Sequence, residues 1–589
     1  MTTILGISIS HDGTLSLLRD GIHVFSVAEE RLSRNKGHIG FPFKALGYVF
    51  SSGLVAPEEV DCVAVAIDHF VQGSNRILEF EMADDVPYYD VMNSPAPEGF
   101  AFSQRRFDRS QSPEQLRAAF LDRLREILDG HGCAAPVELV DHHTCHAASV
   151  AYSCTLDDPL VVTMDGEGDG LSGSVSVLGD DGRLRRLHAV SDRDSLGNIY
   201  SHVTRQLGYK IARHEGKITG LAAFGDPAKG GPLLWQAVSV DGGEVSIRGG
   251  AGTIAALSLA DSLRRGKPRL YRPRPRKVAQ RIAHLSPEDQ AAAVQTFLEE
   301  AVCAYVDHWL KATGKRNVAL AGGVFANVKL NQRVAALAPV EGVFVFPNMG
   351  DGGNAAGAAL IAHERLTGSP PPRSDMPNAY LGPAPERSRI EAALAASPVP
   401  LTIGEPADLP GTVAAAIHAG EIVGWFQGGM EYGPRALGHR SIVARPTERH
   451  LNDELNRRLS RTEFMPFAPS CLKERGEEVF VIDKPGTLHT AEFMTITYDV
   501  NPAWSDRIGA VVHIDNTARP QLVAAEQNPD YHAMIAAYER LSGLPLVVNT
   551  SFNVHEEPIV CLPEEGLRAL TDGVIDALAI GPFYVTCAG

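Results

Sequence analysis

The feature that most constrains the fold of this chain is a pattern that occurs twice in its N-terminal half. One copy begins with the apolar run Ile4–Ser10, and the other begins with Leu160–Met164. An acidic turn containing glycine follows each run, His11–Gly13 in one copy and Asp165–Gly170 in the other. Two further short apolar runs follow each turn, as expected for antiparallel strands. We therefore expect a duplicated α/β domain with a cleft between its halves; two unrelated hairpins are the alternative.

The chain length and one proline-rich segment predict how the rest is organised. With 589 residues, the chain is too long for a single hydrophobic core, and its apolar content of 44% is enough to form several. The segment Thr367–Pro385 has many prolines and no apolar periodicity, which is typical of a linker. We therefore expect an N-terminal domain over residues 1–366, a linker over 367–385 and a C-terminal domain over 386–589.

Charge and cysteine usage exclude several classes of protein. A formal net charge of −17 disfavours general binding to nucleic acids or membrane surfaces, so any anionic substrate needs a local cluster of arginine and lysine. The eight cysteines form no CxxC pair, which predicts reduced thiols in a cytoplasmic protein. The N-terminus does not resemble a signal peptide, and no apolar run approaches the roughly 18 residues of a membrane span.

A pair of histidines is the strongest candidate for a metal site. His142 and His146 are four residues apart, so on a helix they share one face and both imidazoles can reach one ion. A catalytic site needs at least one more ligand and an open position, and Asp165 and Asp351 are the acidic candidates because each lies in a glycine-rich turn. A histidine pair on a helix that binds no metal is the alternative.

A long helix is predicted over Ser286–Thr313. Ser286 is the expected N-cap, Pro287 occupies the first helical position, and Asp289 is placed to complete a capping box. Gly314 marks the expected end of the helix.

The strand Val318–Ala321 follows this helix and leads through Gly322-Gly323 into a helix that begins near Phe325. Such a loop can contact a nucleotide, although two glycines there often serve packing alone. Lys217, in the segment Arg213–Lys217, can bind a phosphate as a point charge; a salt-bridged surface turn is the alternative.

The C-terminal part concentrates arginines near glycine-rich turns. In an acidic protein this pattern favours a pocket for a phosphorylated small molecule, because the guanidinium group matches phosphate oxygens. Arginines scattered over the surface are the alternative. The polar residues concerned are Arg435, Arg440, Arg457, Arg458, Arg461, Arg519 and the segment Asn549–Asn553.

Taken in order, these motifs resemble those of the NodU/CmcH-type carbamoyltransferases. The resemblance covers nearly the whole chain apart from Pro227–Ser286 and the linker. The motifs that carry it are DHHxxHAAS, DGxGD, EGKxxGLAAFG, GGVFANVKLN, GDGGNAAGAA, GxMEYGPRALGxRS, PFAPS and NTSFN with EEPIV.

The resemblance implies a fold and a reaction in two steps. It implies an ASKHA-type N-terminal domain, similar to the enzyme that transfers threonylcarbamoyl to tRNA, and a YrdC-like C-terminal domain. The YrdC-like domain would cleave carbamoyl phosphate and join the carbamate to AMP, with release of pyrophosphate from ATP. The ASKHA-like domain would then transfer the carbamoyl group to a hydroxyl of a small natural product, of antibiotic type, with release of AMP.

The resemblance also implies roles for individual residues. The implied ligands of Fe²⁺ or a similar divalent ion are His142, His146, Asp165 and Asp351. The implied nucleotide contacts, with Mg²⁺ accompanying ATP, are Lys217, Gly322, Gly323, Asn327 and Gly352. The implied pocket for carbamoyl phosphate and ATP consists of Arg435, Arg440, Arg461, Arg519, Asn549, Ser551 and Asn553. The candidates for the general base, which must accept the proton of the acceptor hydroxyl, are His11 and Asp12.

The chain departs from the family pattern at two places. Thr462 and Met465 stand where an acidic residue and an arginine are expected, and His555-Glu556 stands where a residue followed by glycine is expected. Both places lie in the predicted adenylate-forming domain, and they weaken the assignment of Arg461.

Two other functions are consistent with parts of the pattern. A threonylcarbamoyl transferase acting on tRNA is disfavoured by the negative charge and by the presence of both domains on one chain. A non-catalytic ATP-dependent interaction module is disfavoured by the paired histidines and the arginine-rich second domain. A homodimer is compatible with the sequence, and no nucleic-acid or membrane partner is expected.

Overall fold

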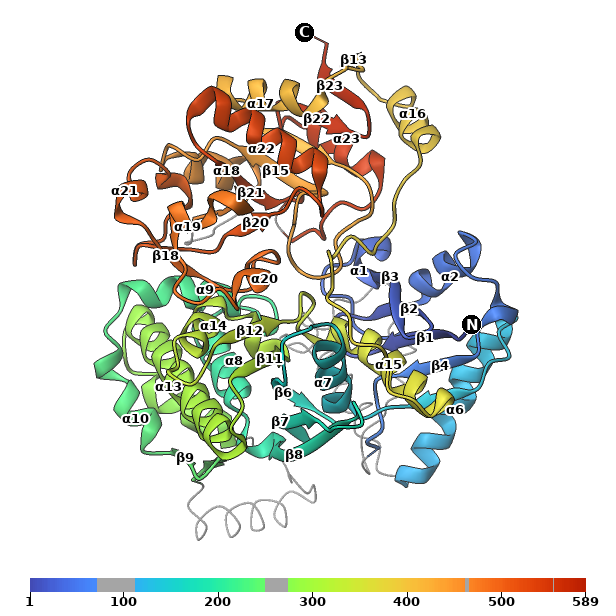
Figure 1. The fold of residues 1–589 in the computed structure, drawn as a ribbon, viewed down its shortest axis with the longest axis vertical. Helices are drawn as coiled ribbons and strands as arrows, with labels where there is room; N and C mark the ends of the chain where they lie inside the picture. The colour runs from blue at the N-terminus through green and yellow to red at the C-terminus, as the bar shows by residue number, and fades with distance from the viewer. Residues whose placement is uncertain (71–111, 249–273, 461–465, 555, 589) are drawn as a thin grey trace, which may run out of the picture.

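The computed structural model describes the chain except for residues 71–111, 249–273, 461–465, 555 and 589. Figure 1 shows an N-terminal part, coloured blue to yellow-green, and a C-terminal part, coloured orange to red, that lies against one side of it. None of the helices among the described residues combines the length and the apolar character that crossing a bilayer requires.

The N-terminal part contains two five-stranded sheets with the same strand order. In the first sheet the order is β3 (Ile22–Ala28), β2 (Thr14–Arg19), β1 (Thr3–Ser8), β4 (Cys62–Val65) and β5 (Val137–Leu139). In the second it is β8 (Leu184–Ser191), β7 (Leu171–Leu178), β6 (Leu160–Gly168), β11 (Asn317–Ala321) and β12 (Gly342–Val345).

Strand directions are also the same in the two sheets. The central strand β1 pairs antiparallel with β2 and parallel with β4, and β6 pairs in the same way with β7 and β11. The registers place Ile4 opposite Leu18 in one sheet and Val162 opposite Val175 in the other. The predicted duplication is therefore confirmed, and with it the ASKHA-like class of the N-terminal domain.

Two helices lie between the sheets and hold them together. Helix α7 (His142–Tyr152) follows β5 of the first sheet but packs on β6 and β11 of the second, whereas α15 (Asn354–Thr367) follows β12 and packs on β1 and β2. Their backbones approach closely, because a Cβ atom on Gly357 of α15 would lie 1.9 Å from the carbonyl oxygen of Cys145 on α7. A side chain at this crossing would separate the helices, and with them the two sheets.

The predicted long helix is confirmed as α13 (Pro287–Thr313). The Ser286 side chain accepts a hydrogen bond from the backbone N–H of Asp289, and Gly314 ends the helix with a φ of 72°. The capping box is only half formed, because the Asp289 carboxylate turns away and accepts from the backbone of Asp226 and from Lys229 Nζ.

The βα unit that follows differs slightly from its prediction. Strand β11 is followed by a short 3₁₀ turn, η6 (Gly323–Ala326), and the helix α14 (Val328–Ala335) begins later than expected. Asn327 is the N-cap of α14, because its side chain accepts from the backbone N–H of Leu330.

The C-terminal part is built on an eight-stranded mixed sheet. Its strand order is β13 (Leu401–Gly404), β23 (Phe583–Cys587), β22 (Ala577–Ile580), β14 (Val423–Phe426), β15 (Arg440–Ala444), β21 (Leu546–Ser551), β16 (Ala468–Leu472) and β20 (Gln521–Val523). Helices α17 (Leu409–Ala419) and α22 (Pro529–Ser542) pack against one another, and α22 also packs on β16 and β21. This part is α/β as expected; its likeness to YrdC stays a prediction.

Residues 368–386 contain no helix or strand, and this segment is tied to both parts of the molecule. The backbone N–H of Thr155 donates to the Asp375 carboxylate over 2.8 Å, and that of Ser26 donates to the Leu381 carbonyl over 2.9 Å. Gly382 donates to the carbonyl of Met430 in the C-terminal part over 2.8 Å. The predicted linker is therefore hydrogen-bonded to both parts, although many of its side chains are exposed.

Candidate functional site

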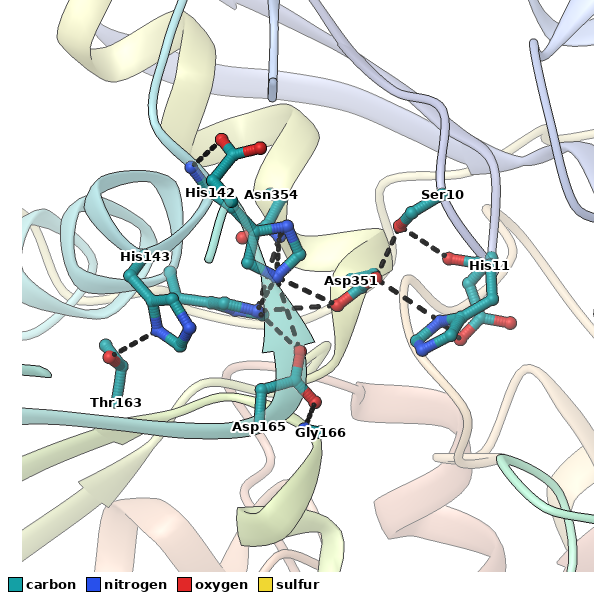
Figure 2. A network of polar contacts seen from close by, with 12 residues as sticks. Ser10, His11, His142, His143, Thr163, Asp165, Gly166, Asp351 and Asn354 are labelled. Carbon is teal, nitrogen blue, oxygen red and sulfur yellow. Dashed lines mark hydrogen bonds and ion pairs between the residues drawn. The ribbon is translucent and has the colours of Figure 1, made fainter. Parts of the chain in front are cut away.

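Three separate elements of the N-terminal part carry the candidate metal ligands. His142 and His146 lie on the first turns of α7, which begins there because the Asp141 side chain caps it. Asp165 lies on β6, and Asp351 begins the short turn η7 (Asp351–Gly353) that leads into α15. Figure 2 shows the side chains of His142, Asp165 and Asp351 pointing toward one another, and His146 belongs to the same group. The structure therefore brings together residues that are far apart in sequence.

The four ligand atoms form a compact, buried group, within 4.8 Å of one another. His142 Nε2 lies 3.3 Å from Asp165 Oδ2 and 3.4 Å from Asp351 Oδ1. His146 Nε2 lies 3.4 Å from the same atom of Asp165 and 3.5 Å from that of Asp351. Two imidazole nitrogens and two carboxylate oxygens so arranged could hold a divalent transition metal. We refer to His142, His146, Asp165 and Asp351 as the centre.

Charges within the centre stabilise one another despite their burial. Burial opposes the charged form of His142, but Asp351 and Asp165 outweigh it and hold its pKa well above the ordinary value. Burial likewise opposes ionisation of Asp165, yet its hydrogen bonds with His142 and His146 lower its pKa to about 2. The pKa of Asp351 is also far below its usual range, because His11 and His142 outweigh burial. Both carboxylates are thus ionised at neutral pH and available to a cation.

Two residues beside the centre differ in their relation to it: Asn354 faces the centre, whereas His143 does not. The amide of Asn354 is fully buried, with its Nδ2 3.3 Å from His146 Nε2, and its Oδ1 accepts no hydrogen bond from any described residue. His143, by contrast, faces away and shares a hydrogen bond of 2.9 Å with Thr163 Oγ1. Burial, together with the nearby His142, lowers the pKa of His143 to about 3, so it is neutral and separate from the centre.

The two candidates for the general base lie at the edge of the centre. His11 Nδ1 is 3.4 Å from Asp351 Oδ2 and 3.8 Å from Asp12 Oδ2. Burial disfavours charge on His11, but Asp351 and Asp12 outweigh it and raise its pKa to about 9. Asp12 has a φ of 63° and a half-exposed side chain. Sequence reasoning missed Ser10, which donates a hydrogen bond to Asp351 Oδ2 (Figure 2).

The three glycines predicted to contact a nucleotide lie beside residues of the centre, and their contact with a nucleotide stays a prediction. Gly322 has a φ of 103°, and a Cβ atom there would lie 2.1 Å from the Met164 carbonyl oxygen. A Cβ atom on Gly323 would lie 2.8 Å from Asp165 Oδ1, and one on Gly352 would lie 2.7 Å from the Asn348 amide nitrogen. At each of these positions the neighbouring atoms leave little room for a side chain.

A hydrogen bond links the C-terminal part to the backbone beside the centre. Tyr432 Oη donates to the carbonyl of Gly352 over 2.9 Å, one residue beyond Asp351. The tyrosine is buried, and its ring packs edge to face on His23 of the first sheet. The sequence offered no signal for this contact, because Tyr432 belongs to a different domain.

A second site is a cavity of about 310 Å³ between the two parts. Lys217 and Asn327 line it from the N-terminal part, and the remaining predicted lining residues come from the C-terminal part. The cavity thus unites residues that the sequence assigned to two different sites. Those from the C-terminal part are Arg435, Arg519, Asn549, Ser551 and Asn553.

Basic side chains dominate this cavity. Lys36, Arg213 and His214 line it in addition to the predicted cations, and their spacing in the sequence did not reveal that they meet. Arg435 forms no ion pair with any described residue, and its guanidinium makes only a long hydrogen bond of 3.4 Å with the carbonyl of Ala326. Burial lowers the pKa of Arg435 to about 10, so it remains charged at neutral pH. A partly buried cation without a counter-charge favours an anionic ligand. We refer to this space as the cationic cavity.

Arg440 does not line the cationic cavity, contrary to its predicted place. It is fully buried, and its guanidinium donates to the backbone carbonyls of Gln427, His439 and Gly428 and stacks 3.7 Å above the ring of Phe426. These carbonyls accept from both Nη groups of the guanidinium within the C-terminal core, so Arg440 is not available to a ligand. Arg461 lies outside the described residues.

Glu431 shapes the loop that carries Arg435. Its Oε1 atom accepts hydrogen bonds from the backbone N–H groups of Leu437, His439 and Arg440, over 2.8, 2.8 and 2.9 Å. A single buried carboxylate therefore fixes the turn after Arg435.

Comparison with known proteins decides the family. Residues 3–360 match the family described as carbamoyltransferase N-terminus, and residues 414–586 match carbamoyltransferase C-terminus. This chain belongs to the carbamoyltransferase family. It is therefore a transferase of carbamoyl groups.

Relatives of this carbamoyltransferase include two nodulation proteins. It is 30% identical to nodulation protein NolNO of Sinorhizobium fredii, over 98% of this chain and 79% of that protein. It is 34% identical to nodulation protein NolO of Bradyrhizobium diazoefficiens, over 76% and 78%. Among solved structures, HypF of T. kodakarensis aligns with a TM-score of 0.32 and 15% identity, over 62% of this chain and 48% of that one, a likeness too weak to build on.

Proposed function

We propose that this carbamoyltransferase uses ATP and carbamoyl phosphate to make carbamoyl-adenylate in the cationic cavity and then transfers the carbamoyl group to a hydroxyl at the centre. The single observation that carries this proposal is the position of the loop Gly322–Asn327. Gly323 packs against Asp165 of the centre, whereas Ala326 and Asn327 at the other end of the loop line the cationic cavity. One short segment thus connects the two sites.

The cationic cavity is suited to the first step. Water first cleaves carbamoyl phosphate to carbamate, and inorganic phosphate leaves. The carbamate oxygen then attacks the α-phosphorus of ATP, the bond between the α-phosphorus and the bridging oxygen breaks, and pyrophosphate leaves. Arg435 and Arg519 are positively charged at neutral pH and can stabilise the negative charge of the phosphates. Asn549 provides a buried hydrogen-bond acceptor, because its Oδ1 accepts no hydrogen bond from a described residue. The volume falls in the range of small-molecule sites, roughly 300–1,000 Å³.

The centre is suited to the second step, in which the acceptor oxygen attacks the carbamoyl carbon and the bond to the AMP oxygen breaks. His142, His146, Asp165 and Asp351 would hold Fe²⁺ or a similar divalent ion, which when bound supplies Lewis-acid polarisation of the carbamoyl oxygen. Ser10 and Asn354 orient this ligand set by their contacts with Asp351 and the histidines. His11 and Asp12 are the residues proposed to receive the hydroxyl proton. Because the pKa of His11 is raised to about 9, His11 must first lose its own proton, whereas Asp12, whose pKa burial raises to about 6, can accept one directly at neutral pH.

The remaining parts of the proposal concern partners and organisation. Mg²⁺ accompanies ATP, and the acceptor is a small hydroxyl-bearing natural product of antibiotic type. Adenylate formation belongs to residues 386–589 and transfer to residues 1–366, with 367–385 between them. The protein works in the cytoplasm, with a homodimer as its proposed assembly.

The half-reactions can be tested separately. With ATP and carbamoyl phosphate but no acceptor, under anaerobic, iron-replete conditions, we expect pyrophosphate release that stops when carbamoyl phosphate is omitted. His142→Ala should retain this release but lose metal and carbamoyl transfer. If no release occurs, the proposed chemistry is wrong; if His142→Ala loses both half-reactions while staying folded, the division between the two sites is wrong.

A further inference from the structure

Glu556 is the one acidic side chain among the described residues that line the cationic cavity. Its carboxylate is held by three groups of the N-terminal part. Oε2 lies 3.2 Å from Lys210 Nζ and 3.4 Å from Arg213 Nη1, and Oε1 lies 3.3 Å from His214 Nε2. These three residues belong to the segment between α8 (Leu196–Gln206) and α9 (Glu215–Leu221). A side chain of the C-terminal part thus binds residues of the N-terminal part across the cationic cavity.

The backbone of Glu556 adopts an unusual conformation to reach this position. Its φ is 61°, in the left-handed region that glycine occupies freely and other residues occupy rarely. This is the position at which the chain departs from its expected motif, where glycine was anticipated. A side chain kept at such a position despite the strain is a candidate for a functional role.

The three side chains that face Glu556 all present hydrogen-bond donors to it, and most of the charge around them is positive. The backbone N–H of Lys210 donates to His214 Nδ1 over 3.2 Å, so the proton of a neutral His214 ring lies on Nε2 and points at Glu556. Burial opposes charge on Glu556, but Lys210 and His214 outweigh it and lower its pKa to about 2, so the carboxylate is ionised. Lys36 and Lys217 add further positive charge to the same cavity. One carboxylate therefore faces a surplus of cations.

Three converging N–H donors with surplus positive charge are the features that recognise a phosphate group. A carboxylate presents two oxygens and one negative charge, whereas a pyrophosphoryl group presents more of both. We propose that Lys210, Arg213 and His214 form a subsite for a pyrophosphoryl group, and that the Glu556 carboxylate occupies this subsite until such a group displaces it. This inference rests on the proposed use of the cavity by ATP, and it assigns the subsite to the β- and γ-phosphates.

Displacement gives the subsite a selectivity. A ligand must displace the Glu556 carboxylate to bind the subsite. A multiply charged pyrophosphoryl group therefore binds there more tightly than the single phosphate group of AMP. After pyrophosphate leaves, the carboxylate returns to the cations and favours release of the product. Glu556 thus acts as a specificity-determining residue for the length of the phosphate chain.

The test is calorimetric titration of the full-length protein with inorganic pyrophosphate. Glu556→Gln keeps the shape of the side chain and removes its charge, and we expect it to bind pyrophosphate at least tenfold more tightly than the unmodified protein. Glu556→Gly removes the carboxylate and suits the positive φ, and it should show the same gain. Adding Lys210→Met to Glu556→Gln should abolish the gain.

The neighbouring residue provides a matched control. Glu557 does not line the cavity, and its carboxylate pairs with Arg568 over 3.0 Å on the surface, so Glu557→Gln should leave pyrophosphate affinity unchanged. If both Glu556 variants bind no more tightly than the unmodified protein, the subsite is wrong while the proposed function stands. If the unmodified protein and all folded variants fail to bind pyrophosphate, the proposed use of the cavity is wrong as well, and the subsite falls with it.

Discussion

The centre and the cationic cavity are built in contrasting ways. The centre is buried, acidic and histidine-containing, and all four of its ligands lie on regular elements of one duplicated domain. The cavity is open and basic, and much of its lining lies on loops of two different parts. The difference teaches that the fold fixes the first site through strand order and helix position, whereas the second exists only because two domains meet.

The substitution with the largest expected effect disrupts the centre and leaves the cationic cavity intact. We expect Asp165→Asn to lose the bound metal and to slow carbamoyl transfer by about a thousandfold, since Lewis-acid stabilisation is worth several kcal/mol. Metal analysis and an acceptor-dependent assay measure this. His143→Asn is the matched control, because His143 lies beside the centre without facing it, and it should keep the metal. Retention of metal by Asp165→Asn would contradict the proposed ligand set.

The substitution with the next largest effect changes the cationic cavity and leaves the centre intact. Arg435→Ala should lower kcat/KM for pyrophosphate release by about a hundredfold, in line with the loss of one preorganised charged donor. Metal content should not change, because Arg435 does not touch the centre. Arg435→Lys should restore only part of the loss, because a single ammonium replaces a forked donor. An unchanged rate for Arg435→Ala would show that the cavity does not hold the reacting phosphates.

A third prediction separates Arg440 from Arg435, the other arginine of the same motif. Arg440→Met should lower the free energy of unfolding by about 2 kcal/mol, because several buried carbonyls lose their donor. Pyrophosphate release per folded molecule should stay near that of the unmodified protein. Urea denaturation and a rate normalised to folded protein measure both. A selective rate loss without loss of stability would instead place Arg440 in the catalytic machinery.

The smallest effect concerns a carboxylate outside both sites. Glu492 is buried and accepts from Lys473 Nζ over 2.6 Å and from Gln527 Nε2 over 2.7 Å, and it pairs with His489. Burial opposes its charge, but these partners lower its pKa below the ordinary value. We expect Glu492→Gln to cost about 1 kcal/mol of unfolding free energy at neutral pH.

The pH dependence of this cost follows from the lowered pKa. A group whose pKa is depressed by folding contributes stability above its unfolded pKa of about 4.3, and this stability is lost as the pH falls through the folded value. The difference between Glu492→Gln and the unmodified protein should therefore shrink below about pH 4. A difference that grows on acidification would mean that Glu492 is protonated in the folded protein.

The sequence predicted the centre better than the cavity for a physical reason. A spacing of four residues on α7 and glycine-rich turns after strands are local signals, and strand order then brings His146, Asp165 and Asp351 together. Arg440 carries the same kind of signal as Arg435, but only the tertiary structure shows that its guanidinium is satisfied by nearby carbonyls. The cations that hold Glu556 come from another domain, so no local pattern could reveal them.

The hydrogen bond from Tyr432 to the Gly352 carbonyl has a consequence for how such proteins can evolve. Through this bond the C-terminal half supplies a hydrogen-bond donor to a carbonyl beside Asp351. One half therefore cannot be exchanged for that of another protein without affecting the other half. Recombination that brought in a foreign C-terminal half would have to supply a phenol at the same point. Without it, a carbonyl next to a metal ligand would lose this hydrogen bond, and inheritance of the two halves as one gene avoids that mismatch.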